Sequence, residues 1–120
     1  MNIFEFFEKS AVDKLRKEIK NASGNEVFFR GIPNEDGVIV DAEVVARGNE
    51  YSVAAILNRM KKNEVIIHNH PSGVLAPSDN DIQISSVYGE LGGGSYIINN
   101  QVSDLYVIVS IKKHIKIKKK

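Results

Sequence analysis

Cysteine is absent from this chain of 120 residues. Its absence excludes zinc sites built on thiolates, and with them the Cys-x-x-Cys half of the zinc site of nucleobase deaminases. Long hydrophobic runs are also lacking, because no segment approaches the length of a membrane span. The apolar residues at the N-terminus are interrupted by Glu5, Glu8 and Lys9, which is not the pattern of a signal peptide. We therefore expect a cytoplasmic protein with no membrane partner.

Positive charge is concentrated at the C-terminus. Six lysines lie in the last nine residues, KKHIKIKKK, so residues 1–111 carry a formal charge of −5 against +1 for the whole chain. This distribution argues against direct nucleic-acid binding by the body of the protein. We expect one domain at residues 1–111, followed at 112–120 by a lysine-rich tail or the start of a linker. Alternating isoleucines at 111, 115 and 117 also allow a short edge strand, and His114 is expected to be an ordinary polar residue.

Hydrophobic periodicity predicts an α/β domain. Residues spaced by three or four, including Phe4 and Phe7 as core residues, predict an amphipathic helix over 3–20. Further helices are expected near 53–60 and 79–91, the last ended by a triple glycine. Strands are expected at 26–31, 37–47, 64–69, 95–99 and 105–110. Together these elements predict a mixed β-sheet flanked by helices.

The densest group of chemically active side chains is the segment HNHPSGVLAPSDND, from His68 to Asp81. It holds two of the three histidines in the chain. In a strand, His68 and His70 project to the same face roughly 7 Å apart along the backbone, so their rings can meet at one metal ion. The sequence SDND at 78–81 predicts the start of a helix, whose macrodipole favours an ionised Asp81.

Two imidazoles and one carboxylate leave a tetrahedral zinc with one open position, which is typical of a catalytic site. Water in that position becomes a nucleophile near neutral pH. Iron, manganese and nickel also accept these ligand types. Ser78 and Asp81 would form a helix capping box even without a metal, but the cap does not account for the two neighbouring histidines.

The pattern His-x-His, seven residues, Ser, two residues, Asp resembles the motif of the JAMM (JAB/MPN) metalloproteases. The wording HNHPSG followed by PS is most similar to the RadC-like branch of that superfamily. The resemblance implies a three-layer, cytidine-deaminase-like fold and a water-activating glutamate near the first predicted strand. Glu26, in GNEVFFRG, matches that place, and Glu43 is the alternative. Glu64 is discounted because it lies roughly 13 Å from His68 along the strand.

With these assignments the resemblance implies hydrolysis of an amide. His68, His70 and Asp81 would hold one zinc ion, Glu26 would be the general base, and Ser78 would stabilise the oxyanion. The expected substrate is a ubiquitin-like conjugate or a peptide tail, although the chain has little room for the insertions with which deubiquitinating relatives grip their substrate. The first alternative is a RadC-like accessory module without peptidase activity. The second, a metal-free scaffold, is disfavoured by the complete ligand set.

A further resemblance concerns the order VVARGN, VIIHNHPSG and PSD. It is similar to the N-terminal JAMM domains of bacterial DinG-type helicases. Together with the RadC-like wording, this resemblance implies an accessory module of a DNA repair or helicase protein, with a fused or associated helicase as partner.

Overall fold

The computed structural model describes residues 2–48 and 52–111. Within these residues the chain forms a short 3-10 helix, three α-helices and five strands. In chain order they are η1 (Ile3–Glu5), α1 (Lys9–Asn21), β1 (Val27–Pro33), β2 (Ile39–Arg47), α2 (Val53–Arg59), β3 (Val65–Asn69), α3 (Asp79–Glu90), β4 (Gly94–Ile98) and β5 (Leu105–Val109).

The five strands form one mixed sheet in the order β2-β1-β3-β4-β5. β3 and β4 are parallel, and the other neighbouring pairs are antiparallel. The parallel pair requires a crossover, which α3 supplies. The predicted class, a mixed sheet flanked by helices, is confirmed.

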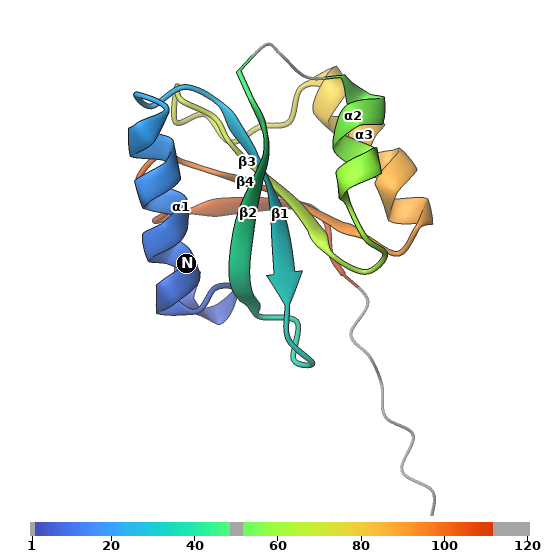
Figure 1. Cartoon of the computed structure of the whole chain (residues 1–120), viewed down its shortest axis with the longest axis horizontal. Coiled ribbons are helices and arrows are strands. Elements are labelled where there is room, and N and C mark those ends of the chain that lie inside the picture. The colour runs from blue at the N-terminus through green and yellow to red at the C-terminus, as the bar shows by residue number, and fades with distance from the viewer. Residues whose placement is uncertain (1, 49–51, 112–120) are drawn as a thin grey trace, which may run out of the picture.

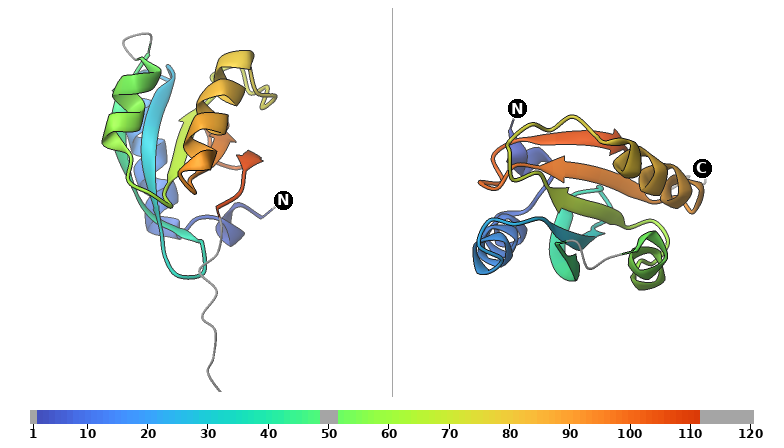
Figure 2. Two further views of the ribbon diagram at one scale, coloured as in Figure 1. Left: turned by 90° about the vertical axis from the view of Figure 1, so that its right-hand side faces the viewer. Right: turned by 90° about the horizontal axis from the view of Figure 1, so that it is seen from above.

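The helices cover the sheet on both sides (Figures 1 and 2). α1 lies on one face and α2 and α3 lie on the other. β3 shows how one strand serves both layers, because its side chains alternate between the faces. Val65 and Ile67 join the core under α1, whereas Ile66 joins the core under α2 and α3. His68 follows Ile66 on the α2/α3 face, where its ring stacks on Phe28 of that core.

The prediction of one helix over residues 3–20 is wrong in its first part. The helix begins only at Lys9, because the carbonyl of Phe6 and the amide of Glu8 pair with Ile39 at the start of β2. The amide of Ile39 donates to the carbonyl of Phe6 at 2.8 Å, and the amide of Glu8 donates to the carbonyl of Ile39 at 2.9 Å. Phe7 is buried as expected, but Phe4 is 51% exposed and is not a core residue.

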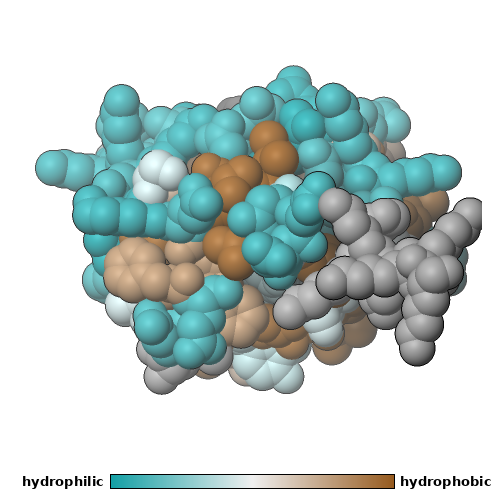
Figure 3. Space-filling view, turned by 90° about the horizontal axis from the view of Figure 1, so that it is seen from below, coloured by the Kyte–Doolittle hydropathy of each residue, from teal (hydrophilic) through white to brown (hydrophobic). Residues whose placement is uncertain are grey.

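The end of the molecule seen in Figure 3 has hydrophobic surface lying between hydrophilic side chains.

Within residues 2–48 and 52–111, every helix falls short of the length and hydrophobicity that crossing a membrane requires. The predicted edge strand beyond residue 111, His114 and the lysine-rich tail lie outside the described residues.

Candidate metal centre

Both histidines of the predicted site lie at the carboxyl end of β3. His68 is fully buried, and its ring stacks on Phe28 of β1 with centroids 4.8 Å apart. His70 follows the strand, and its amide donates to the carbonyl of Ile98 at 2.9 Å. The Nδ1 atom of His70 lies 2.8 Å from the carbonyl oxygen of Val74. A carbonyl only accepts, so Nδ1 carries a proton, and in the neutral ring Nε2 is then the nitrogen free to bind a metal ion.

Asp81 enters the site from the first turn of α3. The Ser78 hydroxyl accepts from the amide of Asp81 at 3.1 Å, and the amide of Ser78 donates to Asp81 Oδ2 at 2.9 Å. These reciprocal bonds form the capping box that the sequence predicts. The cap places the Asp81 carboxylate, which is nearly buried, at the end of β3.

Four ligand-type atoms from three side chains meet at this point. The Nε2 atoms of His68 and His70 are 3.2 Å apart, His68 Nε2 is 3.1 Å from Asp81 Oδ1, and His70 Nε2 is 3.0 Å from Asp81 Oδ2. Ligands at zinc bond lengths in tetrahedral geometry are separated by about 3.3 Å. The three side chains therefore form a triangle of nearly the size that a tetrahedral ion needs.

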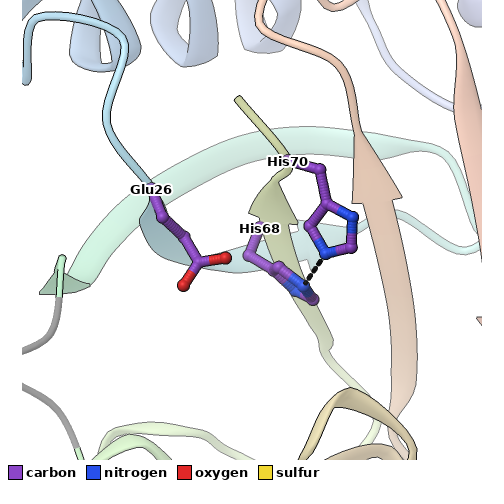
Figure 4. Close-up of side chains that lie close together, drawn as sticks. All are labelled: Glu26, His68 and His70. Atoms are coloured by element: carbon purple, nitrogen blue, oxygen red, sulfur yellow. Dashed lines mark hydrogen bonds between the residues drawn. The ribbon is translucent and has the colours of Figure 1, made fainter. Parts of the chain in front are cut away.

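Glu26 lies beside the same histidines. It immediately precedes β1 and is half-buried. Its carboxylate is directed toward His68 (Figure 4), and single ligand atoms of Glu26, His68 and His70 all lie within 4.8 Å of one another. Two overlapping sets of three side chains could thus hold an ion, since either Asp81 or Glu26 can complete the histidine pair. The ligand atoms of the Asp81 set are 3.0 to 3.2 Å apart, whereas those of the Glu26 set are known to lie within 4.8 Å of one another.

The two carboxyls of the site have pKa values displaced in opposite directions. Burial raises the pKa of Glu26 above its ordinary value, and the nearby histidines only partly oppose this. Burial would also raise the pKa of Asp81, but hydrogen bonds from His68 and Ser78 outweigh it and hold that pKa well below its usual range. Asp81 is therefore the carboxyl that ionises more readily, and Glu26 is the one that binds a proton more readily.

The donor set fits a divalent cation. In the described part of the chain, neither Glu26 nor Asp81 is paired with a lysine or arginine. His68 Nδ1 is the single buried side-chain polar atom of the described residues that lacks a hydrogen-bond partner. The two Nε2 atoms converge on the Asp81 carboxylate, an arrangement that is stabilised by a proton on an imidazole or by a cation bound between the three groups.

The other two candidate carboxylates are engaged elsewhere. Arg30 contacts Glu64 with nitrogen-to-oxygen distances of 2.7, 2.8 and 2.9 Å, and its Nη1 atom is 3.0 Å from Glu43. Since β1 pairs Arg30 with Ile66 and Phe28 with His68, this ion pair lies further along the strands from the histidines. The structure therefore brings Glu26, and not Glu43 or Glu64, next to His68 and His70.

Two contributors to this region were not predicted from the sequence. One is the carbonyl of Val74, which orients His70. The other is Asn69, the residue between the two histidines, which is fully buried and bonded to the backbone on both sides of Glu26. The one available signal for Asn69 was its position inside the His-x-His motif.

One known family matches this chain. A family model for the RadC-like JAB domain matches residues 7–116, a span that contains Glu26, His68, His70, Ser78 and Asp81. No curated protein matches the chain significantly. The resemblance to the RadC-like branch is confirmed, whereas the association with a helicase stays a prediction. With a match over nearly its whole length, the chain belongs to the family of RadC-like JAB domains.

Proposed function

We propose that this protein is a zinc-dependent hydrolase of the JAMM type that cleaves an amide bond in a protein or peptide. The observation that supports this proposal is the convergence of three side chains, with the Nε2 atoms of His68 and His70 and the carboxylate oxygens of Asp81 separated by 3.0 to 3.2 Å. The Glu26 carboxylate lies beside them. His68, His70 and Asp81 would hold the ion. Bound zinc would supply a Lewis acid and lower the pKa of water in its open position.

Glu26 is the proposed general base. Its raised pKa brings it closer to the range in which a carboxyl can both accept and return a proton near neutral pH. It takes a proton from the attacking water and delivers it to the leaving amine. The low pKa of Asp81 complements this role, because a ligand must stay ionised while the base changes state.

Ser78 is the proposed donor to the oxyanion. Its hydroxyl oxygen accepts from the Asp81 amide, and the same hydroxyl also interacts with the Asp81 carboxylate and lowers its pKa. The hydroxyl can keep its bond from the Asp81 amide, which caps α3, and turn its hydrogen from the carboxylate to a substrate carbonyl.

A cleavage screen tests this function. The zinc-loaded protein is incubated with ubiquitin-like fusions and short peptides, with and without a chelator, and compared with Glu26→Gln. We expect cleavage by the wild type, none after chelation, and none by Glu26→Gln although it still binds zinc. Glu43→Gln is the matched control, since it removes a carboxylate that is paired with Arg30, and it should remain active. Cleavage that survives chelation would refute the proposal.

The family match itself favours one alternative, an accessory module without peptidase activity. In that case zinc would bind but no fusion or peptide would be cut. The neighbouring coding sequence would help to distinguish the two functions. A fused or adjacent helicase supports the accessory role, and an adjacent ubiquitin-like protein supports the isopeptidase.

A further inference from the structure

Asn69 lies between the two histidines of β3 but points to the opposite face of the strand. Its side chain is fully buried. A buried amide is costly unless all its polar atoms are bonded, and here its one acceptor and both donors have partners.

The partners of Asn69 flank Glu26. Asn69 Oδ1 accepts from the amide of Val27 at 2.7 Å, and Asn69 Nδ2 donates to the carbonyl of Asn25 at 3.2 Å. The residue before Glu26 and the residue after it are therefore both held by one side chain. Asn69 is also the residue between His68 and His70, the two histidines that face Glu26.

Asn100 extends the contact by one layer. Asn69 Nδ2 donates to Asn100 Oδ1 at 2.7 Å, and Asn100 Nδ2 donates to the carbonyl of Gly24 at 3.0 Å. Gly24 has a φ of +78°, and a Cβ there would lie 3.2 Å from Asn100 Nδ2. The turn that precedes Glu26 thus depends on a glycine and on this pair of amides.

The strand register explains why a side chain is needed here. The β1–β3 ladder ends at the pair Phe28 and His68, and the next pair in that register would be Val27 with Asn69. At that point the Asn69 side chain takes the Val27 amide in place of a backbone carbonyl. Glu26 lies just beyond the end of the ladder, so its placement rests on this bond and on the bond from the Gly48 amide to its own carbonyl, at 2.8 Å.

We propose that Asn69 is a positioning residue that fixes the Glu26 carboxylate against His68 and His70, an inference that rests on the proposed function. Asn69 touches neither a metal nor a substrate. Its side-chain amide joins residues 25–27, which carry the proposed base, to the strand that carries the histidine ligands. The amide therefore sets the distance between Glu26 and the two histidines.

The test uses the Co²⁺-loaded protein, whose visible absorption spectrum reports the surroundings of the ion without any turnover. Asn69→Ala is compared with wild type, with Glu26→Gln and with Asn99→Ala. Asn99 is the matched control, because its side chain also makes three hydrogen bonds, all to the backbone or side chains of Ser103 and Asp104. We expect Glu26→Gln to alter the spectrum and its pH course. Asn69→Ala should follow Glu26→Gln, and Asn99→Ala should follow wild type.

Kinetics on any substrate found in the cleavage screen supply a second measurement. Asn69→Ala should lower kcat by about 10- to 100-fold, with KM and Co²⁺ affinity changed by less than about threefold. Asn100→Ala, which removes only the second layer, should shift the same quantities in the same direction by less. It also keeps the test valid if Asn69→Ala does not fold.

The outcomes separate this inference from the proposed function. If wild type binds no Co²⁺, the metal centre itself is refuted. If Co²⁺ binds and Glu26→Gln changes the spectrum, but Asn69→Ala and Asn100→Ala keep the wild-type spectrum while losing stability, Asn69 is only structural and the inference is overturned. A spectrum unaffected by Glu26→Gln would overturn it as well.

Discussion

Two polar clusters lie on the same face of β1 and β3, separated by Phe28 and Ile66. The histidine cluster comprises Glu26, His68, His70 and Asp81, and the Arg30 cluster comprises Arg30, Glu43, Glu64 and Tyr88. In the Arg30 cluster each carboxylate is paired with the guanidinium. In the histidine cluster two carboxyls face two imidazoles, and no lysine or arginine of residues 2–48 and 52–111 pairs with them.

The comparison shows how similar side chains serve different ends. The Arg30 cluster is neutralised from within, and its bonds to Glu64 raise the pKa of Arg30. The histidine cluster has no lysine or arginine partner among the described residues, and a bound cation would supply the missing positive charge. A buried carboxylate is therefore a candidate for chemistry when its own fold leaves it without a counter-charge.

The largest effect is expected from removal of a proposed zinc ligand, which tests whether the histidine cluster differs from the Arg30 cluster in binding an ion. His68→Ala should lower zinc affinity roughly 1000-fold, about 4 kcal/mol, because two ligands remain where three are needed. Zinc content after dialysis, measured by mass spectrometry, checks this. Glu43→Ala is the control and should keep a full equivalent of zinc. Wild-type protein that holds less than about half an equivalent after refolding with zinc would identify a metal-free scaffold instead.

The reverse experiment breaks the Arg30 cluster. Glu64→Ala should lower the free energy of unfolding by about 3–5 kcal/mol, since it leaves the Arg30 charge nearly buried and held only by the exposed Glu43. Urea denaturation of the chelated protein measures the change. Glu43→Ala should cost much less. Equal losses for the two variants would mean that the Glu64 pair is not the main one.

Alkaline pH should remove the stability that Tyr88 contributes to the Arg30 cluster. Burial raises the pKa of Tyr88 to about 12, and its hydroxyl donates to the carbonyl of Lys61. A raised folded-state pKa means that the contribution is complete below pH ~10 and is lost as pH rises through ~12, by about 2–3 kcal/mol. Denaturation curves of wild type and Tyr88→Phe between these pH values test this. The buried Tyr96 is present in both proteins, so it cancels in the difference. A parallel decline in the two proteins would contradict the prediction.

The smallest expected effect separates the two roles of Ser78. Ser78→Ala should lower the free energy of unfolding by about 1 kcal/mol through loss of the cap, whereas Ser78→Gly should cost only a few tenths. Both variants lack the hydroxyl. Thermal unfolding measures the first role and cleavage rate the second. If Ser78→Gly retained full activity, the proposed oxyanion role would be wrong and the residue would be only a cap.

Local patterns predicted the elements that hold the site. The apolar run before His68 predicted β3, and strand alternation predicted that His68 and His70 share a face. The capping sequence at Ser78 predicted the start of α3. These features depend on neighbours in the sequence, so a single chain reveals them.

Long-range contacts explain what the sequence could not reveal. Glu26 was chosen by resemblance, and its place beside His68 depends on the β1–β3 register, which pairs Phe28 with His68, 40 residues later in the chain. The break of the first helix depends on Ile39, which offers residues 6–8 a strand partner although their hydrophobic spacing continues the helical pattern. Asn69 projects away from the motif that contains it, and only the folded chain shows its partners.

The capping box also has a consequence for the entropy of metal binding. Asp81 Oδ2 is held by the Ser78 amide as α3 forms, and the ring of His70 is held by Val74. Two of the three proposed ligands have therefore lost their rotational freedom during folding, before an ion arrives. Preorganisation of this kind leaves little conformational entropy to be lost on binding. A longer side chain at position 81, even another carboxylate, would forfeit that advantage.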